Sequence, residues 1–133
     1  IARDVRGTRA RIVLDGRPVK GHVLMVVIGN SRLYGGFLQI THQASVTDGL
    51  LDVCIVEAMP RGEFAKLVMR VRHGDHVGSD GVHYVQVPSI DIVSADPISV
   101  NVDGEPSDAQ QLEYRARRGD LRIHLPHLPG EGD

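Results

Sequence analysis

The sequence has 133 residues, of which 41% are hydrophobic and 24% are charged, as in one ordinary globular domain. Its 15 Lys and Arg against 17 Asp and Glu give a net charge of −2, which argues against a dedicated nucleic-acid-binding protein. Cys54 is the only cysteine, so an internal disulfide is excluded and a reducing compartment is favoured. No apolar run approaches the roughly 18–20 residues of a membrane-spanning helix, and the start at Ile1-Ala2-Arg3-Asp4 suggests a piece of a longer protein.

The periodicity of the apolar residues predicts mainly β-structure. Apolar runs at 9–14 and 22–28 flank Asp15-Gly16, and an Asp-Gly pair between two such runs predicts a β-hairpin. The nearly continuous apolar runs 23–28 and 50–56 are typical of strands buried on both faces. Three segments alternate apolar and polar side chains, as half-exposed antiparallel strands do: 83–87, 89–93 and 98–102. Residues 112–116 and 121–125 are predicted to form a closing hairpin with its turn at 118–120.

One helix is predicted, at about residues 61–73, between Pro60 and the capping glycine Gly74. Four apolar residues are expected on its buried face: Phe64, Leu67, Val68 and Val71. Many short antiparallel strands with a single helix predict a mainly β fold, an antiparallel β-sandwich. We expect one domain over residues 1–126 and a flexible tail over residues 127–133.

A glycine-rich segment connects the two strands that are expected to be buried on both faces. It begins at Gly29-Asn30, continues through Tyr34-Gly35-Gly36-Phe37 and ends at Asp48-Gly49. Glycine allows positive φ and close backbone approach, and a loop of this length is either functional or disordered. The Asp48 carboxylate suits a hard cation such as Mg²⁺; the alternative is an Asx-turn that starts the following strand.

The triplet Asp103-Gly104-Glu105 places two carboxylates on either side of a glycine. Asp-Gly is a hairpin-turn signal, whereas carboxylates two residues apart on an extended backbone project from one face of a sheet. In the second arrangement one carboxylate could take a proton from an attacking hydroxyl while the other steers a metal ion or a water. Taken alone, the triplet favours the hairpin turn.

The remaining polar residues give weaker signals. The histidines lack zinc-site spacing and cysteine partners, so exposed loop or strand-edge positions are expected for His73, His76, His83, His124 and His127. A short basic run could face lipid headgroups or phosphate, with a solvated strand face as the default: Arg115, Arg117, Arg118 and Arg122. Cys54, among apolar neighbours, is expected to be a small buried hydrophobic residue.

In combination these motifs resemble the C-terminal domain of the diacylglycerol kinase catalytic-domain family, which also includes sphingosine kinases. The motifs occur in that family's order and spacing: Gly29-Asn30, Gly35-Gly36-Phe37, residues 48–53, Gly74-Asp75-His76 after the helix, and Asp103-Gly104-Glu105. The resemblance extends from about Val5 to Pro126. It implies a β-sandwich packed against an N-terminal nucleotide-binding domain, with the active site in the cleft between them.

The resemblance also implies roles for individual residues. Glu105 matches the general base that takes the proton of the lipid hydroxyl, and Asp103 matches a residue that organises metal and water near the ATP phosphates. Asp48 matches a structural Mg²⁺ site that backbone carbonyls at or near Ser45 and Leu50 complete. The cleft wall would be shaped by Asn30 and Gly36. One departure is the segment 31–33, Ser-Arg-Leu, because glycine commonly follows the matching asparagine.

The implied function is that of the lipid-side domain of an ATP-dependent lipid kinase that converts diacylglycerol to phosphatidic acid. The family's glycine-rich nucleotide motif, GGDGT, is absent from the sequence, so we expect the chain alone to bind ATP poorly and to be inactive. The resemblance implies Mg²⁺, ATP, a lipid at the membrane surface and the protein's own N-terminal domain as partners. It also implies a cytoplasmic protein that associates peripherally with the membrane, as a monomer or a homodimer. The alternatives are a kinase for a sphingoid-type lipid and a non-catalytic, metal-stabilised β-sandwich interaction domain.

Overall fold

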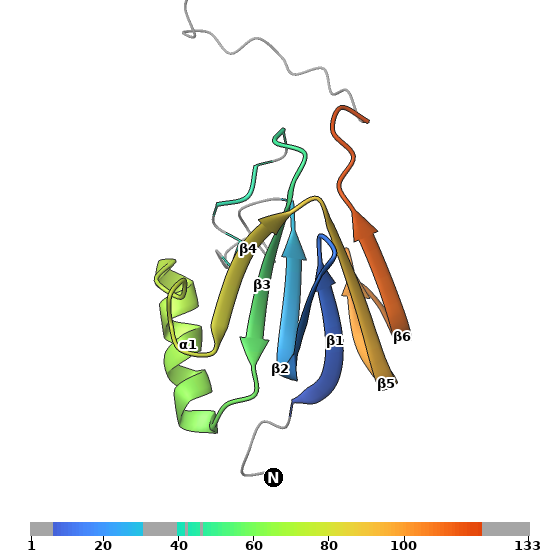
Figure 1. The fold of residues 1–133 in the computed structure, drawn as a ribbon. Helices are drawn as coiled ribbons and strands as arrows, with labels where there is room; N and C mark the ends of the chain where they lie inside the picture. The colour runs from blue at the N-terminus through green and yellow to red at the C-terminus, as the bar shows by residue number, and fades with distance from the viewer. Residues whose placement is uncertain (1–6, 31–39, 42, 46, 121–133) are drawn as a thin grey trace, which may run out of the picture.

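The structure, a computed structural model, describes residues 7–30, 40–41, 43–45 and 47–120. Six antiparallel strands form one sheet in the order β4-β3-β2-β1-β5-β6, and one helix packs beside it (Figure 1). The elements in chain order are β1 (Thr8–Leu14), β2 (Arg17–Gly29), β3 (Leu51–Glu57), α1 (Arg61–His73), β4 (Val82–Val87), β5 (Ser89–Val102) and β6 (Glu105–Arg115). The prediction of a mainly β, antiparallel, sandwich-like fold with one helix at 61–73 is confirmed.

Two Asp-Gly pairs form two-residue hairpin turns in the sheet. Asp15-Gly16 alone joins β1 to β2, and Asp103-Gly104 alone joins β5 to β6. All four residues have positive φ, 47° and 78° in the first turn and 49° and 90° in the second. These angles are typical of the type I′ turn, whose twist matches that of the flanking strands. The hairpin predicted at Asp15-Gly16 is therefore confirmed.

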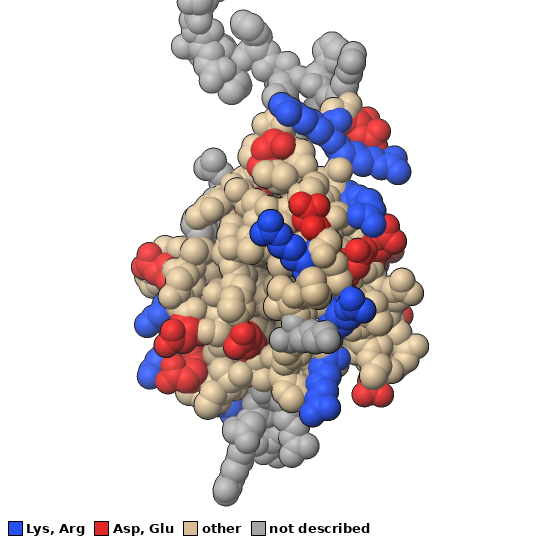
Figure 2. Space-filling view, in the orientation of Figure 1, with Lys and Arg blue, Asp and Glu red and all other residues tan. Residues whose placement is uncertain are grey.

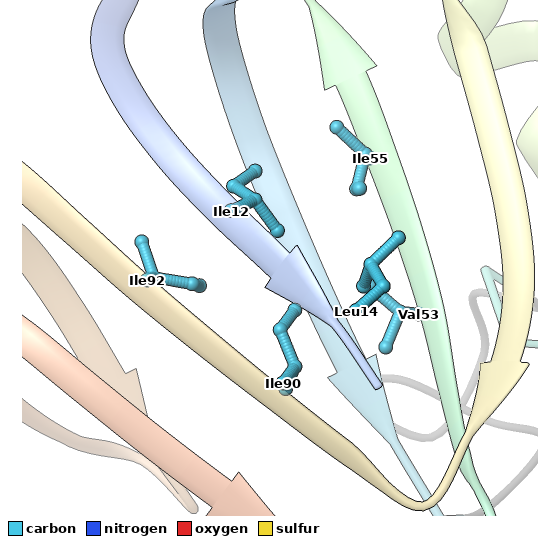
Figure 3. Close-up of a cluster of buried hydrophobic side chains, with 6 residues drawn as sticks. All are labelled: Ile12, Leu14, Val53, Ile55, Ile90 and Ile92. Atoms are coloured by element: carbon cyan, nitrogen blue, oxygen red, sulfur yellow. The ribbon is translucent and has the colours of Figure 1, made fainter. Parts of the chain in front are cut away.

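The sheet curls because its two longest strands are irregular. The register of β2 on β3 shifts between Val23 and Met25, and that of β5 on β6 shifts between Val93 and Ile98. Such irregularities bend a strand and increase its twist. In the sheet order β2 lies between β1 and β3, yet side chains of β1 and β3 meet inside the curl (Figure 3). One curled sheet thus gives the sandwich-like arrangement.

Two hydrophobic clusters lie on opposite faces of this sheet. The inner cluster is built by β1, β3 and β5, and its buried members are Ile12, Leu14, Val53, Ile55, Ile90 and Ile92 (Figure 3). The outer cluster lies between the sheet and α1, and its buried members are Val27, Ile40, Cys54, Val56, Leu67 and Val82. Residues 23–28 of β2 and 53–56 of β3 contribute to both clusters, which explains why these two segments are apolar at every position.

Helix α1 begins directly after Pro60 and ends at Gly74, which has a left-handed φ of 76°, as predicted. Leu67 is buried, but Val68 is 46% exposed, so its expected place on the buried face is wrong. The residues that face the sheet follow a spacing of three and four: Phe64, Leu67 and Val71. Among the described residues no helix is long and apolar enough to cross a membrane.

The last strand is longer than its sequence pattern suggests. Residues 112–115 pair with residues 89–92 of β5, while 121–125, their expected partner, lies outside the described residues. The strand begins already at Glu105, because the two-residue turn before it fixes the register in which β6 pairs with β5. Residues 105–111 are nearly all polar and exposed, so no alternation marks them as a strand.

Cys54 is 1% exposed on β3, which confirms its prediction as a buried residue. Burial raises the pKa of its thiol from 9.0 to about 11. The unfolded thiol therefore ionises at lower pH than the folded one. Its contribution to stability is complete below pH 9.0 and is lost as the pH rises to about 11.

We therefore expect the free energy of unfolding to fall less steeply with pH in Cys54→Ala than in the unsubstituted protein. Urea denaturation at about pH 8 and about pH 11 measures the two slopes, and the difference isolates the thiol from other groups that titrate there. If the free energy of unfolding fell equally steeply with pH in both proteins, the raised pKa of the Cys54 thiol would be contradicted.

Candidate functional site

A groove of about 910 Å³ lies within the curl of the sheet. Its walls are mainly aliphatic, from β2, β5 and β6: Val23, Leu24, Val26, Ile28, Val100 and Leu112. Strands β2 and β5 both pair antiparallel with β1, so they run in the same direction and their C-terminal ends lie on the same side. Polar residues follow both strand ends and also line the groove: Asn30 and Thr41 after β2, and Asp103 after β5. The groove thus combines an apolar trough with polar groups contributed by two strand ends.

The structure places Asn30 and Asp103, two predicted site residues, on the same groove. The hairpin-turn interpretation of the Asp103 triplet is confirmed, and the Gly104 N–H donates to Asn101 Oδ1 at 2.9 Å within it. The alternative, in which Asp103 and Glu105 project from one face of an extended strand, does not form, because the backbone at 103–104 is left-handed. Glu105 instead begins β6 with an exposed side chain, next to the turn that lines the groove. The remaining predicted cleft residue, Gly36, lies outside the described residues.

The predicted metal-loop residues lie in the segment that leads into β3. Asp48 Oδ1 accepts the Leu50 N–H at 2.9 Å, which confirms the alternative of an Asx-turn. Ser45 Oγ lies 3.1 Å from Thr47 Oγ1. Gly49, with a φ of 71°, lies against the Arg118 side chain, so this turn also contacts the segment after β6. The Asp48 carboxylate is therefore held in one orientation by its own backbone.

The donor atoms around Asp48 decide which cation the loop could hold. No three His, Cys, Asp or Glu side chains come together in the part of the chain that the structure describes. A cation at Asp48 would have one carboxylate ligand, with backbone carbonyls and water as the others. Mg²⁺ commonly binds through one or two carboxylates and retains several waters, whereas structural zinc requires cysteine or histidine ligands. The residues present therefore fit Mg²⁺.

A polar cluster around one buried carboxylate, which the sequence did not predict, lies beside this loop. Asp52, which is fully buried on β3, accepts hydrogen bonds on Oδ2 from Tyr84 Oη at 2.5 Å and from Gln86 Nε2 at 3.1 Å. Burial, together with the bond to Asp52, raises the pKa of Tyr84, so the phenol keeps its proton. The available signal was a lone aspartate inside an otherwise apolar strand, where a charge requires partners.

His76 differs from its prediction. It is fully buried, with Nε2 2.6 Å from the Ile40 carbonyl oxygen, so its expected exposed position is wrong. The chain turns inward after the helix cap, which a local pattern does not reveal. His73 and His83 are exposed as expected, and His83 Nε2 lies 2.7 Å from Glu57 Oε1. Two more predicted positions, His124 and His127, lie outside the described residues.

Two residues of the basic run at the end of β6, Arg115 and Arg117, are offset by neighbouring carboxylates. Arg115 lies 2.7 Å from Glu113 and 3.7 Å from Asp91, and Arg117 lies 3.6 Å from Asp120. Figure 2 shows acidic and basic side chains interspersed over this part of the surface. The default interpretation of a solvated strand face is favoured, while Arg122 lies outside the described residues.

These features define a class of protein, a sandwich-like antiparallel domain with an apolar groove bordered by a carboxylate turn. Residues 3–125 match the family described as the YegS C-terminal NAD kinase beta sandwich-like domain. The chain belongs to this family, and its resemblance to the C-terminal domain of bacterial lipid kinases is confirmed.

Two relatives named probable lipid kinase YegS-like illustrate the similarity. The protein from Pseudomonas putida is 38% identical over 108 residues, 80% of this chain and 34% of the relative. The protein from Pseudomonas aeruginosa is 37% identical over 123 residues, 92% of this chain and 40% of the relative. A crystal structure of a diacylglycerol kinase from Bacillus anthracis shares the fold, with a TM-score of 0.64, 17% identity and coverage of 86% of this chain and 41% of that chain. The chain thus spans well under half the length of these proteins.

The end of β2 generates a stability prediction. Thr41 is 1% exposed and packs so closely on Gly29 that a Cβ at residue 29 would lie 3.0 Å from the Thr41 Cβ and nearer still to Oγ1. Gly29→Ala should therefore lower the free energy of unfolding by roughly 1–3 kcal/mol, measured by urea denaturation.

Two further variants make this prediction specific. Thr41→Ala in the Gly29→Ala background should recover part of the loss, because it removes the atoms that clash. Gly62→Ala is the control, since nothing lies within 4 Å of its Cβ position. Equal losses from both glycine substitutions would contradict the contact.

Proposed function

We propose that this chain is the lipid-side domain of an ATP-dependent lipid kinase that phosphorylates a lipid hydroxyl, with diacylglycerol as the favoured substrate. The observation that carries the proposal is the groove, whose aliphatic walls lead to the Asp103 turn and to Glu105 beyond it. Its volume of about 910 Å³ is in the range of small-molecule sites, about 300–1,000 Å³. Membership of a family whose relatives are named lipid kinases supports the same conclusion.

In this proposal the groove walls take up hydrocarbon and the polar end receives the hydroxyl of the lipid. An alcohol must lose its proton as its oxygen attacks the γ-phosphorus of ATP, and a positioned carboxylate assists by accepting that proton. Glu105 is the proposed acceptor, and its exposure leaves it accessible to a bound lipid. The new oxygen–phosphorus bond forms as the bond to the β-phosphate breaks and ADP leaves. Asp103, on the groove wall, is proposed to orient water and metal near the phosphates, and Asn30 and Gly36 to shape the cleft.

The rest of the proposed enzyme lies beyond this chain. The chain covers 34% to 40% of the relatives' length. We propose that the ATP site lies in an N-terminal domain of the parent protein. We propose that the isolated chain transfers no phosphate and that the parent acts at a membrane surface, where its substrate resides. Mg²⁺ would be held by Asp48 and by carbonyls at or near Ser45 and Leu50, and when bound it would add structural rigidity to the loop.

Glu105→Gln in the parent protein should reduce turnover by roughly 100-fold or more while ATP binding is retained, because only the proton acceptor is lost. Transfer of radiolabelled phosphate from ATP to a panel of diacylglycerol and sphingoid lipids measures this effect and identifies the substrate. Glu113→Gln, at another exposed glutamate of β6, is the matched control and should keep normal turnover. Near-normal turnover of Glu105→Gln would remove Glu105 as the base.

Asp48→Asn should abolish any increase in melting temperature that Mg²⁺ gives over chelator, because it removes the carboxylate charge. The amide oxygen can still accept the Leu50 N–H, so the Asx-turn is retained, whereas Asp48→Ala should lose both. Asp80→Asn, at an exposed aspartate of another turn, is the control. The Mg²⁺ site would be disproved if unsubstituted protein and Asp48→Asn gained equally from Mg²⁺.

A further inference from the structure

We propose that Asp52, Tyr84 and Gln86 form a clamp that holds Gln43, together with the nearby Ile40 and Thr41, on the sheet and thereby positions the polar end of the groove. These three side chains are positioning residues, since none of them lines the groove. The consequence for catalysis rests on the proposed lipid kinase function, whereas the clamp itself does not.

The clamp acts on the backbone of a single residue, Gln43. Its N–H donates to Tyr84 Oη at 3.1 Å, and its carbonyl oxygen accepts Gln86 Nε2 at 3.4 Å. Tyr84 and Gln86 both also donate to the same atom, Asp52 Oδ2. A primary amide has two N–H groups and a phenol can donate and accept at once, so both side chains can make their two bonds together. One buried carboxylate thus orients both groups that hold the loop.

Burial of the Asp52 carboxylate costs free energy that an apolar residue in the same position would not cost. It is fully buried, and its Oδ1 has no hydrogen-bond partner among the described residues. Its neighbours on β3 are apolar, and an apolar side chain of similar volume commonly packs at least as favourably as a buried charge. An apolar residue could not accept the hydrogen bonds that orient Tyr84 and Gln86 toward Gln43, and this gives the carboxylate its role.

Two further contacts hold the same short segment. His76 Nε2 lies 2.6 Å from the Ile40 carbonyl oxygen, and Thr41 packs directly on Gly29. Thr41, Gly29 and the next residue, Asn30, all line the groove. The end of β2, the strand β4 and the segment after α1 therefore all contact one of three residues: Ile40, Thr41 and Gln43. Movement of this segment would displace the groove wall next to Asn30.

Tyr84→Phe in the parent protein tests the clamp, because it deletes the hydroxyl at its centre and keeps the ring. Hydrogen exchange of the Gln43 amide, relative to the core amide of Cys54, should accelerate roughly tenfold, as expected for the loss of a hydrogen bond that closes a local opening. Ile90→Val, in the inner cluster and away from the loop, is the control that lowers stability without altering this ratio.

The same variants separate positioning from general stability. Tyr84→Phe should raise the KM for the lipid and leave the KM for ATP unchanged, whereas Ile90→Val should change neither. An unchanged Gln43 exchange ratio would overturn the clamp. Faster exchange with an unchanged lipid KM would overturn its role at the groove. If the unsubstituted parent transferred no phosphate to any lipid, the proposed function would fail, and the exchange ratio would still decide whether the clamp exists.

Discussion

The curl of a single six-stranded sheet is the constraint on which the rest of the structure depends. Irregularities in β2 and β5 bend these strands, so that apolar side chains of β1, β3 and β5 meet in one interior cluster. The same bends leave an aliphatic groove between the far halves of the two strands and bring Asn30 and Asp103 to its lining. A flat sheet of the same order would place these two residues on separate strands with no shared site. The groove is thus a product of how the core is closed.

Polar contacts fix the position of the described residues between β2 and β3. The outer face of the sheet is covered partly by α1 and partly by Ile40, whose carbonyl oxygen contacts His76. Gln43 attaches nearby through Tyr84, which in turn donates to Asp52. Hydrogen bonds are directional, whereas apolar packing tolerates small displacements, so the polar contacts define the position of the segment more sharply. The end of β2, the strand β4 and the segment after α1, which are far apart in the sequence, thus hold the same part of the groove wall. Contacts on the outer face of the sheet therefore help to position the groove wall at Thr41, in addition to covering the core.

Under the proposed function, this site would be the lipid-side half of a catalytic site. This domain supplies an apolar trough, a carboxylate turn and a loop whose oxygen donors fit Mg²⁺, and the relatives it resembles are more than twice its length. Phosphoryl transfer requires positioning of both substrates and neutralisation of charge on the phosphates. The residues of the groove and its turn can serve the acceptor side of that reaction. In the proposed enzyme, the donor side belongs to the part of the parent protein outside this chain.

The sequence by itself determined the features that depend on neighbouring residues. Asp15-Gly16 and Asp103-Gly104 form the turns their dipeptides predict, α1 runs from Pro60 to its glycine cap, and the apolar runs become the strands packed on both faces. Only the tertiary structure decided the curl, the strand over residues 105–111, the burial of His76, and the bond between Asp52 and Tyr84, which are 32 residues apart. Turns and helix caps are set by local backbone preferences, which the sequence displays directly. A partner for a buried carboxylate or histidine is supplied by a distant segment, and that segment is identified only once the sheet has brought the two together.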